Sequence, residues 1–336
     1  MTTPTSQNLL TDIAGVRVGH ADDAKIASGA TAIIFDQPAV TAVDIRGGGP
    51  GTRESALLDL ANTVDQVDAI ALSGGSAFGL DTGSGIQAWL AEQGRGFQVG
   101  DARIPIVPGA IMFDMINGGD KNWGRFSPYR ELGFAAAAAA DTTFRLGSVG
   151  AGFGATTVNF KGGVGSASAT LANGVKVAAL TVVNAMGSVT MGDTPHFWAA
   201  AFEENGEFGG RGWPAQVTPD MLAIRLKGAP DLNPLQNTTL ALVVTDAILT
   251  KPQAKRLAMM AHTGFARAIY PVHAPLDGDI LFASATGEKP IDPLYGLSDL
   301  GAVAANVVAR AMARGVYEAA ALPFPGALPA WKDQFG

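Results

Sequence analysis

Apolar residues occur along this chain in short runs that are typical of buried strands. From residue 238 to 247 the sequence TTLALVVTDA alternates Leu240, Leu242 and Val244 with Ala241 and Val243. Both faces of a strand with this pattern are apolar, so we expect it to be buried on both sides. Similar runs at 68–72, 175–184 and 280–286 predict further strands.

Helical spacing follows the run at 238–247. Thr250 is placed to cap a helix that has Pro252 in its first turn. Apolar positions recur there every three or four residues. They are Leu257, Ala261, Phe265 and Ala268. Further helices are predicted after residue 83, through the six alanines at 135–140, and from Ser298 to about Ala320.

Two other segments add a pair of strands and a long connector to the predicted organisation of the chain. Gly29–Asp44 reads as two short strands around a turn at Gln37 and Pro38. Residues 203–237 concentrate Gly, Pro, Asn and charge, which indicates an exposed connector. The bond between Asn237 and Thr238 therefore joins an exposed connector to the start of a buried strand.

Composition narrows the possible partners. Charged residues make up 16% of the chain, against about 25% in typical soluble domains, and 43 of 336 residues are glycine. The low charge and the Gly- and Ala-rich stretches predict a homo-oligomer that buries surface between subunits. The net charge of −7 excludes nucleic acid as a partner, because no basic excess is present to contact phosphates.

Absent residue types exclude several chemistries. The chain has no cysteine, and its four histidines form neither an HxxxH nor an HExxH pair, so we expect no metal and no cofactor. The first residues lack a signal-peptide pattern, and no run of about 18 apolar residues occurs. These features predict a cytoplasmic protein that does not cross a membrane.

Glycines cluster where a strand runs into a helix, at Gly74, Gly75, Gly79, Gly83 and Gly85. Neither GxGxxG nor the phosphate-loop lysine motif is present. We therefore expect close backbone packing here. A non-enzymatic protein that binds a nucleotide or another small molecule through these loops remains an alternative.

Candidate nucleophiles are few, since no GxSxG motif occurs. Thr238 could become an N-terminal nucleophile if its hydroxyl attacked the Asn237 carbonyl and the resulting ester were hydrolysed. Asp277-Gly-Asp279 places two carboxylates close together, so one of them can hold a proton near neutrality. The alternatives are a capping Asn followed by a strand Thr, and an ordinary Asp-Gly hairpin turn.

The run from Asn237 through NTTLALVVTDAILTKPQAKRLAMMAHTGFARAIYPVHAPLDGDILFA resembles the DmpA-type L-aminopeptidase/D-esterase family. This family includes β-peptidyl aminopeptidases and nylon-oligomer (6-aminohexanoate-oligomer) hydrolases. Upstream blocks extend the resemblance over most of the chain: TDIAGVRVGH, TAVDIRGGGPGTRE, ALSGGSAFGLDTGSG, GAGFGATT and LTVVNAMG. The resemblance implies a four-layer αββα sandwich, like that of N-terminal-nucleophile hydrolases, with the connectivity of ornithine acetyltransferases.

The resemblance also implies site residues. Asn237-Thr238 matches the self-cleavage point of the nylon-hydrolase branch, which makes Thr238 the nucleophile. The family's other catalytic positions match Asp277, Asp279, Lys161 and Asn184. Phe113 stands where the branch has an active-site tyrosine, so a hydroxyl that would position substrate is missing. His262 is expected to pack, and His273 lies near enough to Asp277 to tune it.

These features together predict one globular unit, 1–336, cut into an α chain (1–237) and a β chain (238–336). The predicted function is a self-processing amide hydrolase that acts on ω-amino-acid oligomers or small peptides through an acyl-enzyme. Alternatives are a β-peptidyl or D-amino-acid aminopeptidase, an acyltransferase of the ornithine-acetyltransferase kind, and the non-enzymatic binding protein.

Overall fold

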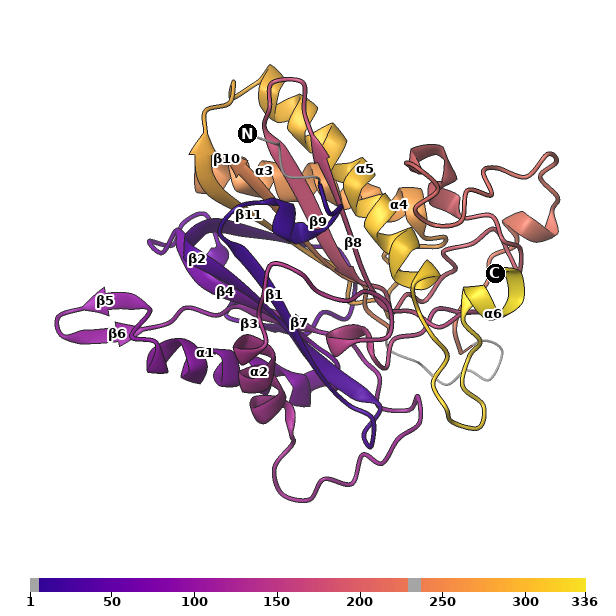
Figure 1. The fold of residues 1–336 in the computed structure, drawn as a ribbon, viewed down its shortest axis with the longest axis horizontal. Helices are drawn as coiled ribbons and strands as arrows, with labels where there is room; N and C mark the ends of the chain where they lie inside the picture. The colour runs from indigo at the N-terminus through magenta and orange to yellow at the C-terminus, as the bar shows by residue number, and fades with distance from the viewer. Residues whose placement is uncertain (1–5, 229–236) are drawn as a thin grey trace.

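Alternating side chains along the strands sort the interior into separate apolar layers. The computed structural model describes residues 6–228 and 237–336 (Figure 1). Along β10 (Leu240–Ala247), Leu240, Leu242 and Val244 face one core, and Ala241 and Val243 face another. All eight residues of β10 are buried, as the sequence predicted.

Within the described residues, nine strands form one hydrogen-bonded ladder. Its order is β3–β7–β4–β2–β11–β10–β9–β8, with β1 paired to β2. The β10–β11 and β4–β7 pairs are parallel, and the other pairs are antiparallel. The strands are β1 (Val16–Asp23), β2 (Ser28–Ile45), β3 (Thr52–Arg53), β4 (Gln66–Ser73), β7 (Gly109–Ile111), β8 (Val164–Thr170), β9 (Lys176–Val182), β10 and β11 (Ile280–Lys289).

Strand β2 joins the two halves of the sheet and corrects the sequence prediction of two short strands. Its first half pairs with β1 and β4, and its second half pairs with β11. Pro38 lies where the register against β4 shifts between Ile34 and Ala39. A proline at such an irregularity removes no ladder hydrogen bond, so the strand continues through it.

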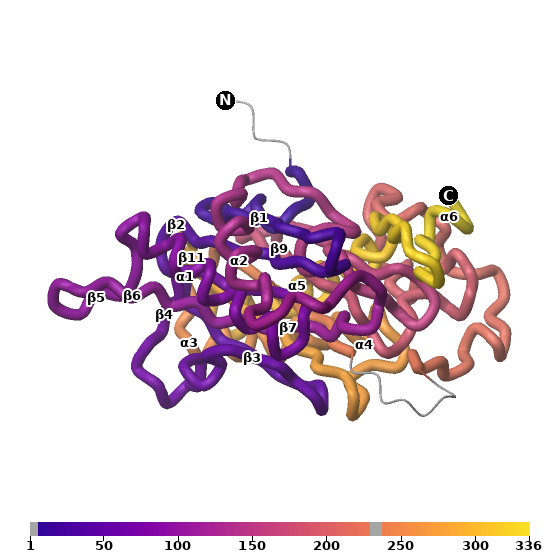
Figure 2. The backbone as a smooth tube through the Cα atoms, turned by 90° about the horizontal axis from the view of Figure 1, so that it is seen from below, coloured from indigo at the N-terminus to yellow at the C-terminus, as the bar shows by residue number. Residues whose placement is uncertain are grey.

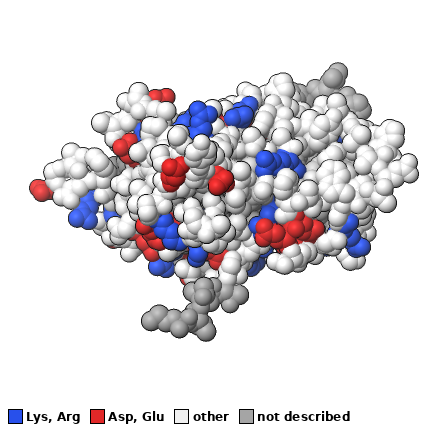
Figure 3. All heavy atoms as spheres, turned by 90° about the horizontal axis from the view of Figure 1, so that it is seen from above, with Lys and Arg blue, Asp and Glu red and all other residues white. Residues whose placement is uncertain are grey.

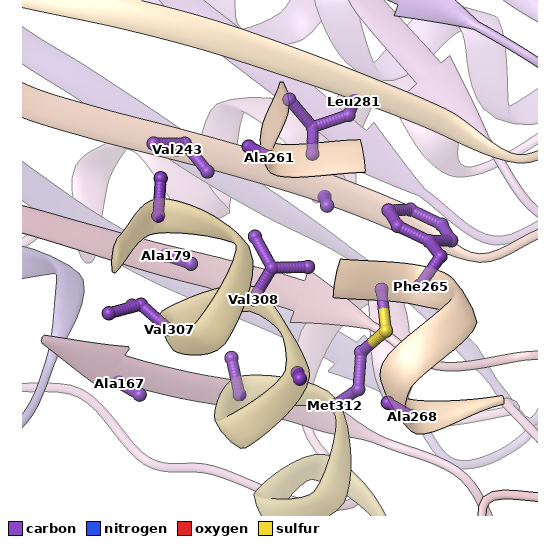
Figure 4. Close-up of a cluster of buried hydrophobic side chains, with 14 of the residues drawn as sticks. Ala167, Ala179, Val243, Ala261, Phe265, Ala268, Leu281, Val307, Val308 and Met312 are labelled. Atoms are coloured by element: carbon purple, nitrogen blue, oxygen red, sulfur yellow. The ribbon is translucent and has the colours of Figure 1, made fainter. Parts of the chain in front are cut away.

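The two halves of the sheet pack face to face, and helices cover both outer faces. α1 (Thr82–Glu92) and α2 (Tyr129–Ala138) cover β2 and β4, while α3 (Lys251–Ala261), α4 (Phe265–Ala268) and α5 (Tyr295–Tyr317) cover the half that contains β10. In Figure 4, Val307 and Val308 of α5 lie over the strands that carry Ala179 and Val243, and Met312 of α5 extends toward Phe265 of α4. The predicted four-layer α/β sandwich is confirmed.

Smaller elements complete the chain. The hairpin of β5 (Phe97–Val99) and β6 (Ala102–Ile104) extends away from the body (Figure 2), and α6 (Trp331–Phe335) lies near the C-terminus. Short 3-10 helices are Leu10–Asp12, Ser55–Leu58, Ser76–Asp81, Gly150–Gly152, Trp198–Phe202, Asp220–Leu222 and His262–Gly264.

No helix in the described ranges is long and apolar enough to cross a membrane. Charged side chains are sparse on the face in Figure 3.

Local details agree with the sequence analysis at two places. The Thr250 side chain accepts a hydrogen bond from Gln253 N and caps α3. Gly85 and Gly133 let α1 and α2 approach closely: a Cβ on Gly85 would lie 1.9 Å from Arg130 O, and one on Gly133 would lie 2.2 Å from Thr82 O. The glycine cluster therefore includes positions that serve backbone packing, as expected.

Candidate active site

The Asn237–Thr238 junction is held by the loop that carries the two aspartates. Asn237 and Asp277 form a parallel β-bridge just ahead of β10 and β11. Asn237 N donates to Leu276 O at 3.0 Å, and Gly278 N donates to Asn237 O at 2.7 Å. The carbonyl of Asn237 is therefore fixed and polarised by a backbone N–H.

Thr238 is buried, and its hydroxyl lies beside the same carbonyl. Oγ1 of Thr238 donates to Asn237 O at 2.5 Å, and Thr238 N donates to Asn184 O at 3.1 Å. Gly278 leaves room for this hydroxyl, because a Cβ on Gly278 would lie 2.4 Å from Oγ1. The central glycine of Asp277-Gly-Asp279 is thus required by the position of Thr238.

Asp279 accepts three hydrogen bonds. Its Oδ1 accepts from Thr239 N at 3.0 Å, and its Oδ2 accepts from His273 N at 3.0 Å and from His273 Nδ1 at 2.8 Å. Asp279 thereby joins Thr239, the residue after Thr238, to the segment before the aspartate pair.

Asp277 lies in a different environment. Burial, together with the charge of Asp279, raises the pKa of Asp277 to about 7. Its Oδ2 accepts from Ala274 N at 3.1 Å, and its Oδ1 accepts a longer bond of 3.3 Å from Met186 N. Asp277 can therefore hold a proton near neutrality.

Asn184 connects the junction to the rest of the site. Besides accepting from Thr238 through its backbone, it accepts at Oδ1 from Thr156 N at 3.0 Å and from Lys227 Nζ at 3.1 Å. Its Nδ2 donates to Phe113 O at 3.1 Å. These partners set the orientation of the Asn184 amide.

Lys161 is buried, and its ammonium donates to three backbone carbonyls. The acceptors are Gly152 O at 3.0 Å, Ala155 O at 2.8 Å and Gly162 O at 2.7 Å. Burial lowers the pKa of Lys161 to about 7. Because three donors is the full capacity of an ammonium group, these bonds use all of its N–H groups and hold the glycine-rich loop.

Lys227 is a site residue that the sequence analysis missed. It lies in the connector that was expected to be exposed, yet its Nζ donates to Thr156 O and to Asn184 Oδ1, both at 3.1 Å. Burial lowers the pKa of Lys227 to about 7, although the charge of Asp277 opposes the shift. A single lysine in a Gly- and Pro-rich segment has no spacing signal that could have identified it.

A cavity of about 250 Å³ opens beside these residues. Phe113, Asp114, Lys161 and Lys227 line it together with apolar side chains from the C-terminal segment. Among the described residues, the lining does not include Thr238 or the aspartates. Lys227 bridges the two regions, since it lines the cavity and contacts Asn184.

Two histidines lie close to the aspartate loop. His262 is buried and packs as expected, and its Nδ1 lies 3.0 Å from Asp44 Oδ2. His273 contacts Asp279 directly, through both its ring and its backbone N–H. Its charge also opposes the upward shift in the pKa of Asp277, which agrees with the tuning role that the sequence analysis considered.

Comparison with known proteins places this chain in a group of peptidases. The pattern of peptidase family S58 matches residues 8–326. An uncharacterized aminopeptidase of Mycobacterium tuberculosis (strain ATCC 25618 / H37Rv) is 42% identical, over 98% of both chains. A 6-aminohexanoate-oligomer endohydrolase of Kocuria sp. (strain KY2) is 29% identical, over 90% of this chain and 84% of the relative.

Among solved structures, the L-aminopeptidase D-Ala-esterase/amidase of Ochrobactrum anthropi has a similar fold. Its TM-score is 0.71 at 20% identity, over 96% of this chain and 90% of the other. That protein is described as a variant of the Ntn-hydrolase fold. The similarity agrees with the four-layer sandwich described above.

Proposed function

This chain belongs to peptidase family S58 and is a hydrolase that acts on amide bonds, and we propose that it cuts itself once to free Thr238 as its nucleophile. The observation that carries the proposal is the geometry around the Asn237 carbonyl. Its oxygen accepts from Gly278 N at 2.7 Å, and the Thr238 hydroxyl lies beside it. A polarised carbonyl next to a hydroxyl is the arrangement that an N→O acyl shift requires.

In the proposed self-cleavage, Thr238 Oγ1 attacks the Asn237 carbonyl carbon. The new C–O bond replaces the C–N bond, and the hydroxyl proton ends on the Thr238 nitrogen. Water then hydrolyses the ester, so Asn237 keeps a carboxylate and Thr238 regains its hydroxyl beside a free α-amine. The products are 1–237 and 238–336, about 24 and about 10 kDa by their share of the 34.4 kDa chain.

Substrate hydrolysis repeats the same chemistry with a second molecule. Thr238 Oγ1 attacks a substrate amide, the amine leaves, and water releases the acid from the acyl-enzyme. Protonated Asp277 supplies a proton to the leaving amine, and Asp279 holds the start of β10 through Thr239. Asn184 donates to the developing oxyanion, while Lys161 and Lys227 provide positive charge.

The proposed substrates are amides of ω-amino-acid units or short peptides. The resemblance of Thr238 and Asp277-Gly-Asp279 to the nylon-hydrolase branch supports the first class, and a relative at 29% identity is named a 6-aminohexanoate-oligomer endohydrolase. The second class, an aminopeptidase activity, is supported by the name of the relatives at 42% identity. Parallel assays of 6-aminohexanoate oligomers, β-alanyl peptides and D-alanine amides, following released amine, distinguish the two classes.

Mass spectrometry of purified protein tests the proposal. We expect two chains that meet at Asn237 and Thr238, and a single inactive chain for Thr238→Ala. Cleavage of Thr238→Ala at the same bond would show that another group is the processing nucleophile. An intact, inactive wild-type chain would favour the non-enzymatic alternative. Acyl transfer to an amine without net hydrolysis would favour the acyltransferase.

A further inference from the structure

Asp279 is bound on one side by Thr239 and on the other by a single residue. Both hydrogen bonds to Oδ2 come from His273, one from its backbone N at 3.0 Å and one from its ring Nδ1 at 2.8 Å. With Thr239 N on Oδ1 at 3.0 Å, the carboxylate bridges the strand that begins at the nucleophile and the segment that contains His273. Its orientation therefore depends on His273.

The backbone of His273 is in the left-handed region, with φ at +56°. Residues that carry a side chain adopt this backbone conformation infrequently, and Gly and Asn adopt it at the lowest cost in free energy. Here it accompanies an arrangement in which the backbone N–H and the ring nitrogen meet the same oxygen atom. A conformation of this kind that persists next to a reactive group is consistent with a role in holding that group.

A second histidine packs behind the ring of His273. His262 is fully buried, and its ring lies edge-on to that of His273 with 4.8 Å between centroids. His262 Nδ1 is held by Asp44 Oδ2 at 3.0 Å, and Asp44 also accepts from Arg46 Nε at 2.7 Å and from Lys255 Nζ at 3.0 Å. The ring of His273 is therefore fixed from behind by side chains of β2 and of the segment after α3.

We propose that His273 is a positioning residue, which holds the Asp279 carboxylate in the orientation needed for self-cleavage and for amide hydrolysis. The inference rests on the proposed function, because it assigns a task to a residue beside the Thr238 nucleophile. His273 donates a hydrogen bond from Nδ1–H to Asp279 and does not contact the reacting bond. His262 and Asp44 act through His273 by fixing its ring.

Two substitutions at His273 distinguish the contribution of its ring nitrogen from that of its backbone conformation. His273→Gly accepts the left-handed φ but loses the Nδ1 donor, whereas His273→Asn accepts the same φ and places an amide N–H close to where Nδ1 stood. His196→Asn is the matched control, since His196 Nδ1 binds Gly212 O at 2.9 Å and its ring has no contact with the aspartate loop. Self-cleavage rate, kcat, KM and thermal midpoint are measured for each variant.

We expect His273→Gly to lower the self-cleavage rate and kcat by at least about tenfold, with KM changed by less than about threefold. His273→Asn should stay within about threefold of the wild type. The proposal is wrong if His273→Gly matches the wild type, even with a lower thermal midpoint. It is equally wrong if His273→Asn is as slow as His273→Gly.

A separate measurement decides the question if His273→Gly does not fold. Nitrogen-15 NMR of the ring in uncut Thr238→Ala protein should find a proton on His273 Nδ1, and a ring without that proton overturns the proposal. Thr238→Ala also separates the two claims. If it is still cut, the proposed function fails; if it stays whole while His273→Gly behaves as wild type, only the role of His273 fails.

Discussion

Gly278 N donates a hydrogen bond of 2.7 Å to the carbonyl oxygen of Asn237, so the loop that carries both aspartates also holds the bond proposed to be cut. One three-residue motif thereby does three things. Asp277 carries the proton, Asp279 fixes the start of β10, and Gly278 polarises the carbonyl while leaving space for the Thr238 hydroxyl.

Gly278→Ala should block self-cleavage, because its Cβ would lie 2.4 Å from Thr238 Oγ1 and would displace the hydroxyl. We expect the rate to fall by at least about a hundredfold, the cost of misplacing a reacting group. Gly49→Ala is the control in the adjoining loop, where a Cβ would lie at an ordinary 3.7 Å from Asp277 O. Cleavage followed on denaturing gels measures both, and equal rates would refute the steric argument.

Asp277→Asn should process and turn over at least about a hundredfold more slowly, because an amide cannot supply the proton. Wild-type self-cleavage should decline as pH rises through about 7, where Asp277 loses its proton. Lys161 and Lys227 also have pKa values lowered to about 7, so Lys227→Met is compared in the same series. If Asp277→Asn still cuts itself and its rate declines with pH as in the wild type, groups other than Asp277 cause the decline.

Protein stability should respond to Asp277 in a defined pH window. The pKa of Asp277 is raised from 3.8 to about 7, so between these values the native state binds a proton that the unfolded chain has released. Stability from this group is present below pH 3.8 and decreases as pH rises toward 7. This is measured by thermal unfolding of the uncut Thr238→Ala protein with and without Asp277→Asn. The change in midpoint caused by Asp277→Asn should be more positive above pH 7 than near pH 4. The same midpoint difference at both pH values would contradict the raised pKa.

Lys227→Met should lower kcat by about tenfold or more, because Asn184 loses a partner that fixes its amide and the site loses a positive charge. Lys25→Met is the control, as the Lys25 side chain is 73% exposed. The two variants are compared with one amide substrate after full processing. Equal kcat values would exclude Lys227 from catalysis.

Phe113→Tyr tests how the cavity selects substrate. Phe113 lines the cavity and leaves it without the hydroxyl expected in the nylon-hydrolase branch. We expect the added hydroxyl to raise kcat/KM for 6-aminohexanoate oligomers by about three- to tenfold, the value of one neutral hydrogen bond. If kcat/KM for β-alanyl peptides and D-alanine amides rises by the same factor, residue 113 does not determine which class of substrate the enzyme prefers.

Much of the fold could be predicted because burial on both faces leaves a clear sequence pattern. The alternation in β10 identified a strand between two cores, and Thr250 identified the start of α3. Strand β2 was divided wrongly because Pro38 usually ends a strand, whereas here it lies at a shift in register. Pairing partners decide that outcome, and they are distant in sequence.

From the residues alone, the site was predictable where motif residues are adjacent in sequence, and the family resemblance added Lys161 and Asn184. Asp277-Gly-Asp279 and Asn237-Thr238 are compact motifs, and the structure brings them together. Lys227 reaches Asn184 through a long side chain that crosses from another part of the fold, and His273 reaches Asp279 through the path of its loop. No spacing rule encodes either contact. For His273, a histidine six residues before an aspartate of the pair was the only available signal.

Intact-mass analysis of purified wild type, Thr238→Ala and Thr238→Ser shows whether Thr238 cuts the chain and then serves as the nucleophile. We predict that the wild type and Thr238→Ser give two chains, the second beginning at residue 238, because serine keeps the attacking hydroxyl. Thr238→Ala should remain one chain of 34.4 kDa without amidase activity. A Thr238→Ala protein that is cut after Asn237, or that hydrolyses amides at the wild-type rate, would contradict the account.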